Sequence, residues 1–400
     1  MFKKMVKVMM ISLLALSLVA CSAGKDEKPT AQTYDLTLWG SQDDQELLNT
    51  LVEEFKKTDP TNTYNITLGV VGEPDALKKV NEDPTAAADV FAFANDQLRD
   101  FVKAGTLYEI TKNVDAIKSA NVEGSIDAVT LDGKMYGYPF TADNGYFMYY
   151  NSEFFTADDM LSLDTMLAKA EAAGKKIFFD LSNGWYIASF FLGGGGSMSI
   201  GADGKQIVDF NNEQGVKVGE YIRKFTASPA FITGDDAILQ AQAADGTVVA
   251  GVSGTWNAGP MAEAYGTGYA ATKLPTISLD GKDVQLSSFA GYKVYGVSTN
   301  TKHPEQAMAL AEFLSNEASQ VKRFEVRKLG PSNIKAASSE AVKADVALNA
   351  LAMQAAFAKS QKDVLGSYWT PAEAFGTEME NKSTADMKTL LDAMVEQIQQ

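Results

Sequence analysis

Short strand-like runs alternate with helical segments along this chain, and that alternation restricts the possible fold more than any other feature. Residues 34–39 alternate between polar and apolar side chains as a β-strand does, and residues 47–55 place apolar side chains at helical spacing. Residues 64–71 and 90–93 are further strand-like runs, separated by a helical stretch. A regular alternation of strands and helices is typical of an α/β domain with a mostly parallel sheet.

The same pattern returns with variations in the middle of the chain. Residues 146–150, 176–181 and 248–252 are strand-like, and residues 158–173 have the apolar spacing of a helix. The chain has 400 residues, which is long enough for about two domains. We therefore expect two α/β units.

The first residues have the features of a secretory signal followed by a lipid attachment site. Three lysines among the first seven residues precede an uncharged apolar run over residues 8–20, which is too short for a transmembrane helix. Cys21 follows directly and is the single cysteine of the chain. We predict a signal peptide at residues 1–20, lipidation of Cys21, and a polar tether over residues 21–33. The protein is then held outside the cytoplasm, on the bacterial cell membrane.

Composition excludes several classes of protein. The formal net charge of −16 argues against a nucleic-acid partner, because such proteins need a basic face. The single histidine, His303, cannot supply the several nitrogen or sulfur ligands of a catalytic zinc. Residues 193–196 are all glycine, but no Gly-Lys-Ser/Thr follows them as in a phosphate-binding loop. We expect no catalytic residue, no metal and no cofactor, although 51 acidic residues leave a two-carboxylate glycosidase as an alternative.

The positive signal for function is aromatic. The four tryptophans each lie near a predicted strand end or turn, at Trp39, Trp185, Trp256 and Trp369. Open α/β sheets bind their ligands at strand ends and in the loops that follow. A sugar ring stacks its apolar C–H faces on aromatic rings, while each of its hydroxyls needs a partner, at a cost of roughly 1–3 kcal/mol if left unpaired. Aspartate and amide side chains beside these tryptophans therefore indicate a sugar site.

Several short motifs occur in an order and spacing that match a known family. They are residues 36–39, 88–96, 104–107, 132–139, 149–151, 254–256, 274–275 and 330–332. Through these motifs the chain resembles the substrate-binding lipoproteins of carbohydrate ABC importers. It is most similar to the maltose/maltodextrin-binding group, over nearly all of its length after the tether.

The resemblance implies a two-lobed α/β fold like that of periplasmic binding proteins of type II, with the ligand cleft between the lobes. The N-lobe is then residues 34–141 plus 277–334, and the C-lobe is residues 142–276 plus 335–400. Nine residues fall at expected cleft positions: Asp43, Phe93, Asp96, Asp143, Asn144, Trp185, Trp256, Tyr368 and Trp369. Either Asp143 or Asn144 takes the place of an acidic ligand contact in the family, and Trp39 is assigned to packing.

The resemblance also implies a ligand and partners. The ligand is maltose or a maltodextrin, the partners are the permease and ATPase subunits of an ABC importer, and the receptor is a monomer attached to the membrane only through Cys21. Two departures from the family pattern leave the sugar open: Asp43-Asp44 replaces Asp-Lys, and Asp96-Gln97 replaces Asp-Arg. The alternatives are a receptor for another oligosaccharide or small solute, and a secreted carbohydrate-active enzyme. Specificity for an anion is disfavoured because the candidate loops lack lysine and arginine.

Overall fold

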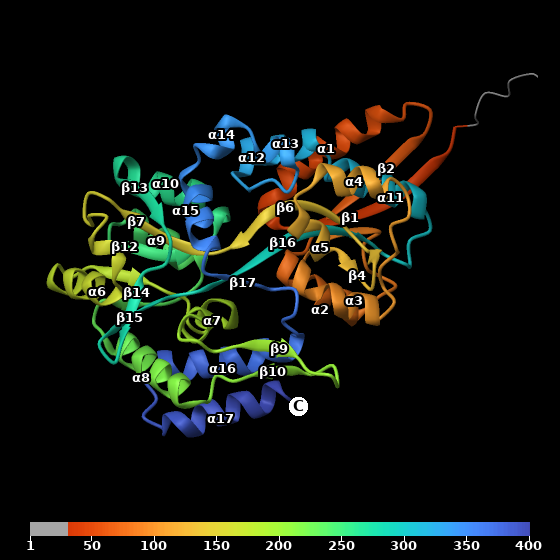
Figure 1. Cartoon of the computed structure of the whole chain (residues 1–400). Helices are drawn as coiled ribbons and strands as arrows, with labels where there is room; N and C mark the ends of the chain where they lie inside the picture. Colours follow the sequence, from red (N-terminus) through yellow and green to blue (C-terminus); the bar gives the residue numbers. More distant parts are fainter. Residues whose placement is uncertain (1–30) are drawn as a thin grey trace, which may run out of the picture.

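A computed structural model describes residues 31–400 of the chain. The predicted signal peptide, Cys21 and most of the predicted tether lie outside the described residues. The described part forms two lobes, each built around its own β-sheet, and Figure 1 shows the N-lobe on the right and the C-lobe on the left. Among residues 31–400, no helix is both long and apolar enough to cross a membrane.

The N-lobe sheet has the strand order β17-β16-β3-β1-β2, and β6 pairs with β16 as well. Its strands are β1 Thr33–Gly40, β2 Thr63–Val70, β3 Val90–Ala94, β6 Tyr138–Gly145, β16 Ser288–Val297 and β17 Ala358–Ser360. Helices around it are α1 Gln45–Thr58, α2 Ala76–Glu82, α3 Leu98–Lys103, α4 Val114–Ala120, α5 Glu123–Ala128, α11 Pro304–Leu314 and α12 Glu317–Arg327. A short hairpin joins β4 Thr130–Leu131 to β5 Lys134–Met135.

The C-lobe sheet has the order β11-β8-β12-β7-β13. Its strands are β7 Phe147–Asn151, β8 Lys176–Phe178, β11 Phe231–Ile232, β12 Val248–Ser253 and β13 Tyr269–Thr272. Two hairpins lie beside it, β9 Met198–Ile200 with β10 Gln206–Val208, and β14 Thr276–Leu279 with β15 Lys282–Gln285. The helices are α6 Leu163–Ala172, α7 Gly184–Gly193, α8 Glu213–Ala227, α9 Asp236–Ala244, α10 Ala258–Tyr265, α15 Val346–Ala355, α16 Trp369–Glu380 and α17 Met387–Ile398, with α13 Ile334–Ala337 and α14 Glu340–Lys343 leading into α15.

These elements confirm the α/β fold expected from the sequence. The predicted run at residues 34–39 is β1, the helical pattern at 47–55 is α1, and both neighbours of β1 are parallel to it. The C-lobe sheet is mixed rather than mostly parallel, because β7 runs antiparallel to β12 and β13. This direction follows from topology, since β7 enters the C-lobe directly from β6 instead of after a crossover helix.

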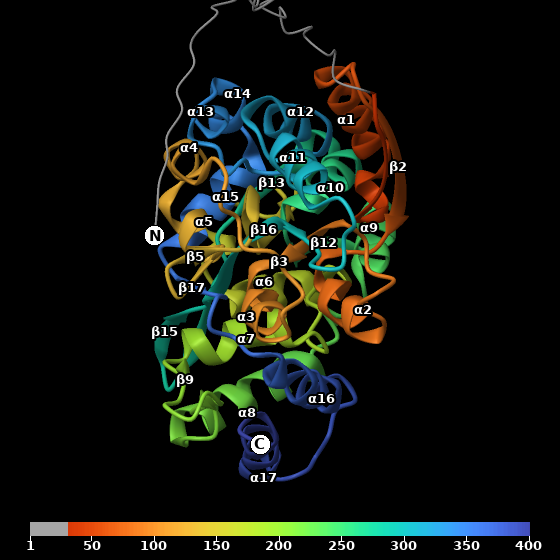
Figure 2. The ribbon, with the colours of Figure 1, turned by 90° about the vertical axis from the view of Figure 1, so that its right-hand side faces the viewer.

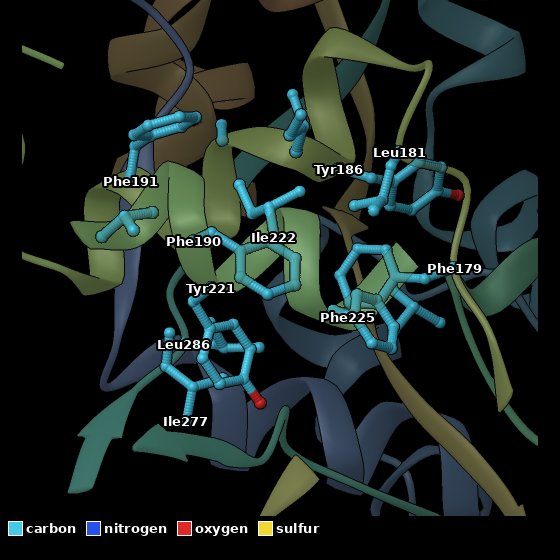
Figure 3. Packing of buried hydrophobic residues seen from close by; sticks show 14 of the residues in the cluster. Phe179, Leu181, Tyr186, Phe190, Phe191, Tyr221, Ile222, Phe225, Ile277 and Leu286 are labelled. Atoms are coloured by element: carbon cyan, nitrogen blue, oxygen red, sulfur yellow. The ribbon is translucent and has the colours of Figure 1, made fainter. Parts of the chain in front are cut away.

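Each lobe has its own hydrophobic core. The C-lobe core gathers the aromatic side chains of α7, α8 and the end of β8, among them Phe179, Phe190 and Phe225 (Figure 3). Helices α8, α16 and α17 lie side by side at the bottom of the molecule and cover this core (Figure 2). The N-lobe core lies between its sheet and helices α1, α3 and α11. Each lobe therefore provides a rigid platform for the loops at its strand ends.

The strands β6 and β16 form an antiparallel ribbon that joins the two lobes. Tyr138 and Tyr295 on this ribbon pack in the N-lobe core, whereas Tyr146, just past β6, and Phe289 pack in the C-lobe core. The lobe limits predicted from the sequence stay a prediction. The β14–β15 hairpin contributes Ile277 and other side chains to the C-lobe core, and β17 joins the N-lobe sheet.

Candidate ligand-binding cleft

A cavity of about 640 Å³ opens between the lobes at the carboxyl ends of their parallel strands. In the N-lobe it is bounded by the loops after β1, β2 and β3, and in the C-lobe by those after β8, β11 and β12. The side chains that line it include Asp43, Asp44, Glu73, Asp75, Asp96, Gln97, Asn144, Asp180, Asn183, Trp185, Tyr186, Asp235, Asp236, Trp256, Lys293, Arg327, Gln361, Trp369 and Glu373. Ligand sites of open α/β sheets lie at this edge because the loops of several strands converge there.

Tryptophan rings form the C-lobe wall of the cavity. The ring centroids of Trp185 and Trp256 lie 5.9 Å apart with 37° between their planes. Tyr146 packs edge-on against Trp185 at 4.5 Å and holds that ring in place from behind. Trp369 lies at the start of α16, where Phe289 packs against it at 6.1 Å. The wall therefore presents apolar ring surface held in a fixed orientation.

Asp236 at the start of α9 fixes the position of Trp256. The Trp256 indole Nε1 donates to Asp236 Oδ2 at 2.8 Å, and Asn257 Nδ2 donates to Asp236 Oδ1 at 2.6 Å. Ser253 Oγ donates to the same oxygen at 3.1 Å. The carboxylate thus ties the turn after β12 to the next helix. It leaves the Trp256 ring little rotational freedom, so stacking on that ring costs little conformational entropy.

On the N-lobe side, Asp96 lies in the turn Asn95–Gln97 before α3 and is largely buried. Gln361 Nε2 donates to its Oδ1 at 2.8 Å, and Gln361 Oε1 accepts from Trp185 Nε1 at 2.9 Å. Burial raises the pKa of Asp96 to about 7, against the opposing effects of its backbone N–H and the Gln361 amide. In the C-lobe, burial likewise raises the pKa of Asp180 to about 6. Two carboxyl groups at the cleft therefore change charge near neutral pH.

Two cations that sequence reasoning missed line the same cavity. Arg327, at the end of α12, donates from Nη2 to Asp43 Oδ2 at 3.0 Å and from Nε to Asp44 Oδ1 at 3.1 Å. Lys293 on β16 places Nζ 5.4 Å from the Trp256 ring centroid, across the cleft. The candidate loops lack lysine and arginine, but the cavity does not, because these two cations come from a helix end and a strand.

Beneath these groups, Asp44 forms a buried ion pair with Arg323. Arg323 also donates from Nη2 to the Tyr295 hydroxyl at 2.7 Å, and its guanidinium lies 4.6 Å from the Phe140 ring centroid. Burial alone would raise the pKa of Asp44, but the charges of Arg323, Arg327 and Lys293 outweigh it and hold the pKa below its usual value. The loop after β1 is therefore fixed to the N-lobe core through Asp44 and Arg323.

The structure places six of the nine predicted site residues in the cavity lining: Asp43, Asp96, Asn144, Trp185, Trp256 and Trp369. The other three are structural. Phe93 is fully buried in the N-lobe core, 4.9 Å from the Phe101 ring. Tyr368 is buried, and its hydroxyl donates to the Gly184 carbonyl at 2.9 Å.

Asp143 is the third residue that the cavity lining does not include. Its Oδ2 accepts from Thr255 Oγ1 at 2.7 Å and from the Gly330 N–H at 2.5 Å, which joins three segments behind the cleft. Neighbouring residues on a strand point to opposite faces, so Asn144 faces the cavity and Asp143 does not. Of the two residues, Asn144 lines the cavity and Asp143 does not, and which of them contacts a ligand stays a prediction.

Some missed lining residues carried a signal in the sequence and others did not. Asp180 and Asp236 follow strands β8 and β11 closely, as the predicted residues follow theirs. Lys293, Arg327 and Gln361 lie within a strand, at a helix end and on a segment between the lobes, where no loop motif marks them. Residues 31–400 contain no group of three histidine, cysteine, aspartate or glutamate side chains arranged to hold a metal ion.

Comparison with known proteins agrees with this geometry. A galactooligosaccharide-binding protein of Bacillus subtilis (strain 168) is 30% identical over 419 residues, which cover 99% of this chain and 96% of the relative. A protein whose structure was solved with acarbose is 33% identical, with a TM-score of 0.84 over 92% of this chain and 99% of that one. The maltodextrin binding protein MalE1 from L. casei BL23, solved without ligand, is 26% identical, with a TM-score of 0.77 over 92% and 99% of the two chains.

The family described as bacterial extracellular solute-binding protein matches residues 50–350, which is most of the chain. Its members function outside the cytoplasm, and the two-lobed fold with a cleft between the lobes is the fold of the similar solved structures. The chain therefore belongs to the family of bacterial extracellular solute-binding proteins.

Proposed function

We propose that this protein is a receptor that binds a maltodextrin-type oligosaccharide in the cleft and delivers it to an ABC importer. The observation that carries the proposal is the composition of the cavity, in which Trp185, Trp256 and Trp369 face carboxylate and amide side chains. The cavity volume of about 640 Å³ is within the range of small-molecule sites.

The rings and the polar side chains meet different requirements of a sugar. Apolar C–H faces of successive pyranose units stack on Trp185 and Trp256, whose centroids lie 5.9 Å apart. Asp96, Asn144 and Asp180 accept or donate hydrogen bonds to the hydroxyl rim, which loses its water when the ligand enters. An uncharged polyhydroxylated ligand is therefore favoured over a purely apolar one.

Two sugars are supported by the relatives. The maltodextrin assignment is supported by the similarity to MalE1, and a galactooligosaccharide is the second candidate because the 30% identical relative is named for it. We propose no catalytic role for the cleft, since the family and the similar solved structures are binding proteins.

Delivery requires a place and a partner. We propose that residues 1–20 are removed, that a lipid on Cys21 holds the monomeric receptor at the outer face of the cell membrane, and that the tether lets the lobes reach the importer's permease. Because the cleft is lined from both lobes, a bound sugar favours the arrangement in which both contact it. The permease, with its ATPase, then recognises that arrangement.

Isothermal titration of the detergent-solubilised full chain with maltose, maltotriose, maltotetraose and a galactooligosaccharide tests the proposal. Saturable binding with intact sugar recovered afterwards supports a receptor, and the tightest ligand identifies the sugar. Trp256→Ala should weaken binding by at least tenfold, while Trp39→Phe, a change at a ring that packs against the N-lobe core, serves as the matched control. No heat with any of these sugars refutes the assignment, and cleaved sugar refutes the receptor.

A further inference from the structure

Gln361 lies where the two lobes and the joining ribbon meet. It follows β17, and its backbone N–H donates to the Ala290 carbonyl on β16 at 3.0 Å. The chain is also held on both sides: before Gln361, Ser360 pairs with Ala290 on β16, and after it, Lys362 Nζ donates to Asp127 at 2.7 Å and Leu365 N donates to Gln206 Oε1 in the C-lobe at 2.6 Å. The Gln361 side chain is thus aimed into the cleft by a backbone fixed at both ends.

The orientation of the Gln361 amide follows from the chemistry of its partners. An indole Nε1 can only donate, so the Gln361 oxygen must face Trp185, at 2.9 Å. Asn144 Nδ2 donates to the same oxygen at 3.4 Å. The amide nitrogen then faces the Asp96 carboxylate, at 2.8 Å. One side chain therefore donates to the N-lobe and accepts from the C-lobe.

We propose that Gln361 is the positioning residue that sets the relative geometry of Asp96 and Trp185, and so of a hydroxyl acceptor on one lobe and a stacking ring on the other. Its amide is the direct hydrogen-bonded link between them. A sugar that stacks on Trp185 then finds the Asp96 carboxylate at a set distance. This inference deepens the proposed function and rests on it.

The Gln361 amide can join Asp96 to Trp185 only if it donates a hydrogen bond to the Asp96 carboxylate. Substitutions that keep or remove this donor therefore test the proposal. Gln361→Glu keeps an acceptor for Trp185 but places a second carboxylate against Asp96, so the two repel when both are ionised. At lower pH the pair shares one proton, which restores a hydrogen bond between them. Gln361→Met removes both links at every pH. Asp100 also raises the pKa of Asp96. The other ionisable lining residues on that side are Asp43, Asp44, Glu73, Asp75, Lys293 and Arg327.

Titrations of the full chain with maltotetraose at pH 8 and pH 5.5 test this. We expect Gln361→Glu to weaken binding at least tenfold at pH 8 and to return within about threefold of the parent at pH 5.5, whereas Gln361→Met stays weak at both. Lys359→Ala, an exposed change two residues away, should bind like the parent. The proposal is overturned if Gln361→Glu and Gln361→Met lose the same affinity for maltotetraose at both pH values. It is also overturned if both variants bind maltotetraose as tightly as the parent.

A second measurement needs no sugar. Trp185 loses its hydrogen-bond acceptor in Gln361→Met and keeps one in Gln361→Glu, so the tryptophan emission should shift to shorter wavelength only in the Met variant. Repeating both changes in a Trp185→Phe background should remove the shift. If the parent binds no oligosaccharide, the proposed function fails, but the emission measurement still decides whether Gln361 positions Trp185. An unshifted emission in Gln361→Met overturns that positioning role.

Discussion

Removing the buried guanidinium of Arg323 should destabilise the N-lobe strongly. The Arg323 side chain is 1% exposed and the Asp44 side chain 4% exposed, so Arg323→Met leaves a carboxylate that is almost fully withdrawn from solvent. The variant also loses the donor to the Tyr295 hydroxyl. Arg327 Nε, 3.1 Å from Asp44 Oδ1, remains and offsets part of the loss.

The magnitude follows from these contacts. Removing one partner of a buried ion pair costs about 3–5 kcal/mol, and the surviving Arg327 contact places this case near the lower end. We expect Arg323→Met to lower the free energy of unfolding by about 3 kcal/mol at pH 7. Adding Asp44→Asn removes the stranded charge, so the double variant should lose less than the sum of the two single variants.

The pH dependence has a definite sign. The folded-state pKa of Asp44 lies below its usual value of 3.8, so in the parent its stabilising contribution is complete above that value and is lost as the pH falls through the lower folded pKa. Arg323→Met removes one of the charges that oppose burial, so the pKa of Asp44 should rise above its value in the parent. The carboxyl group then binds a proton as the pH falls towards 4, and the deficit of the variant should shrink.

Urea unfolding followed by tryptophan fluorescence at pH 7 and pH 4.5 measures these differences. Comparable slopes against urea in all variants are needed for the free energies to be compared. A loss below about 1 kcal/mol for Arg323→Met, or strict additivity in the double variant, would refute the reasoning, because either result means that Asp44 is not held as a buried charge by Arg323.

Three further predictions address the cleft. Trp256→Ala should weaken maltotetraose binding by about tenfold to a hundredfold in calorimetry, and Trp256→Phe, which keeps a ring but loses the donor to Asp236, should lose less. Phe93→Leu should lower the free energy of unfolding by about 1–2 kcal/mol but leave the maltotetraose Kd within twofold, since that ring packs in the core; a large change in Kd would return Phe93 to the site. The pKa of Asp96 is raised to about 7, so its contribution to stability is complete below the unfolded value near 3.8 and is lost as the pH rises through 7. Asp96→Asn should therefore gain thermal stability relative to the parent between pH 5 and pH 8, and an unchanged difference in Tm would contradict the burial of that carboxyl.

The elements of the fold were predictable because local patterns specify them. The strand-like run at residues 34–39 and the apolar spacing at 47–55 correspond to β1 and α1, and the tryptophans that end up in the cleft follow strands or begin helices. The alternation of polar and apolar residues could not show whether Phe93 faces the cleft or the core, because all five residues of β3 are buried. When both faces of a strand are covered, the sequence no longer distinguishes the side chain that faces the ligand from the one that faces the core.

The charges of the cleft could not be predicted for a different reason. Arg327 is 284 residues from Asp43, and this pairing is created by the packing of α12 beside the first loop of the N-lobe and not by any local motif. The loops lack the two cations of the family pattern, yet Arg327 and Lys293 bring positive charge to the same cavity.

Arg327 is held by Asp43 and Asp44, and Lys293 lies over the Trp256 ring. These cations therefore have acidic or aromatic partners before any ligand arrives. An anionic ligand would have to compete with those partners and approach the carboxylates of Asp96, Asp180 and Asp236, whereas a neutral sugar can use the same carboxylates as hydroxyl acceptors.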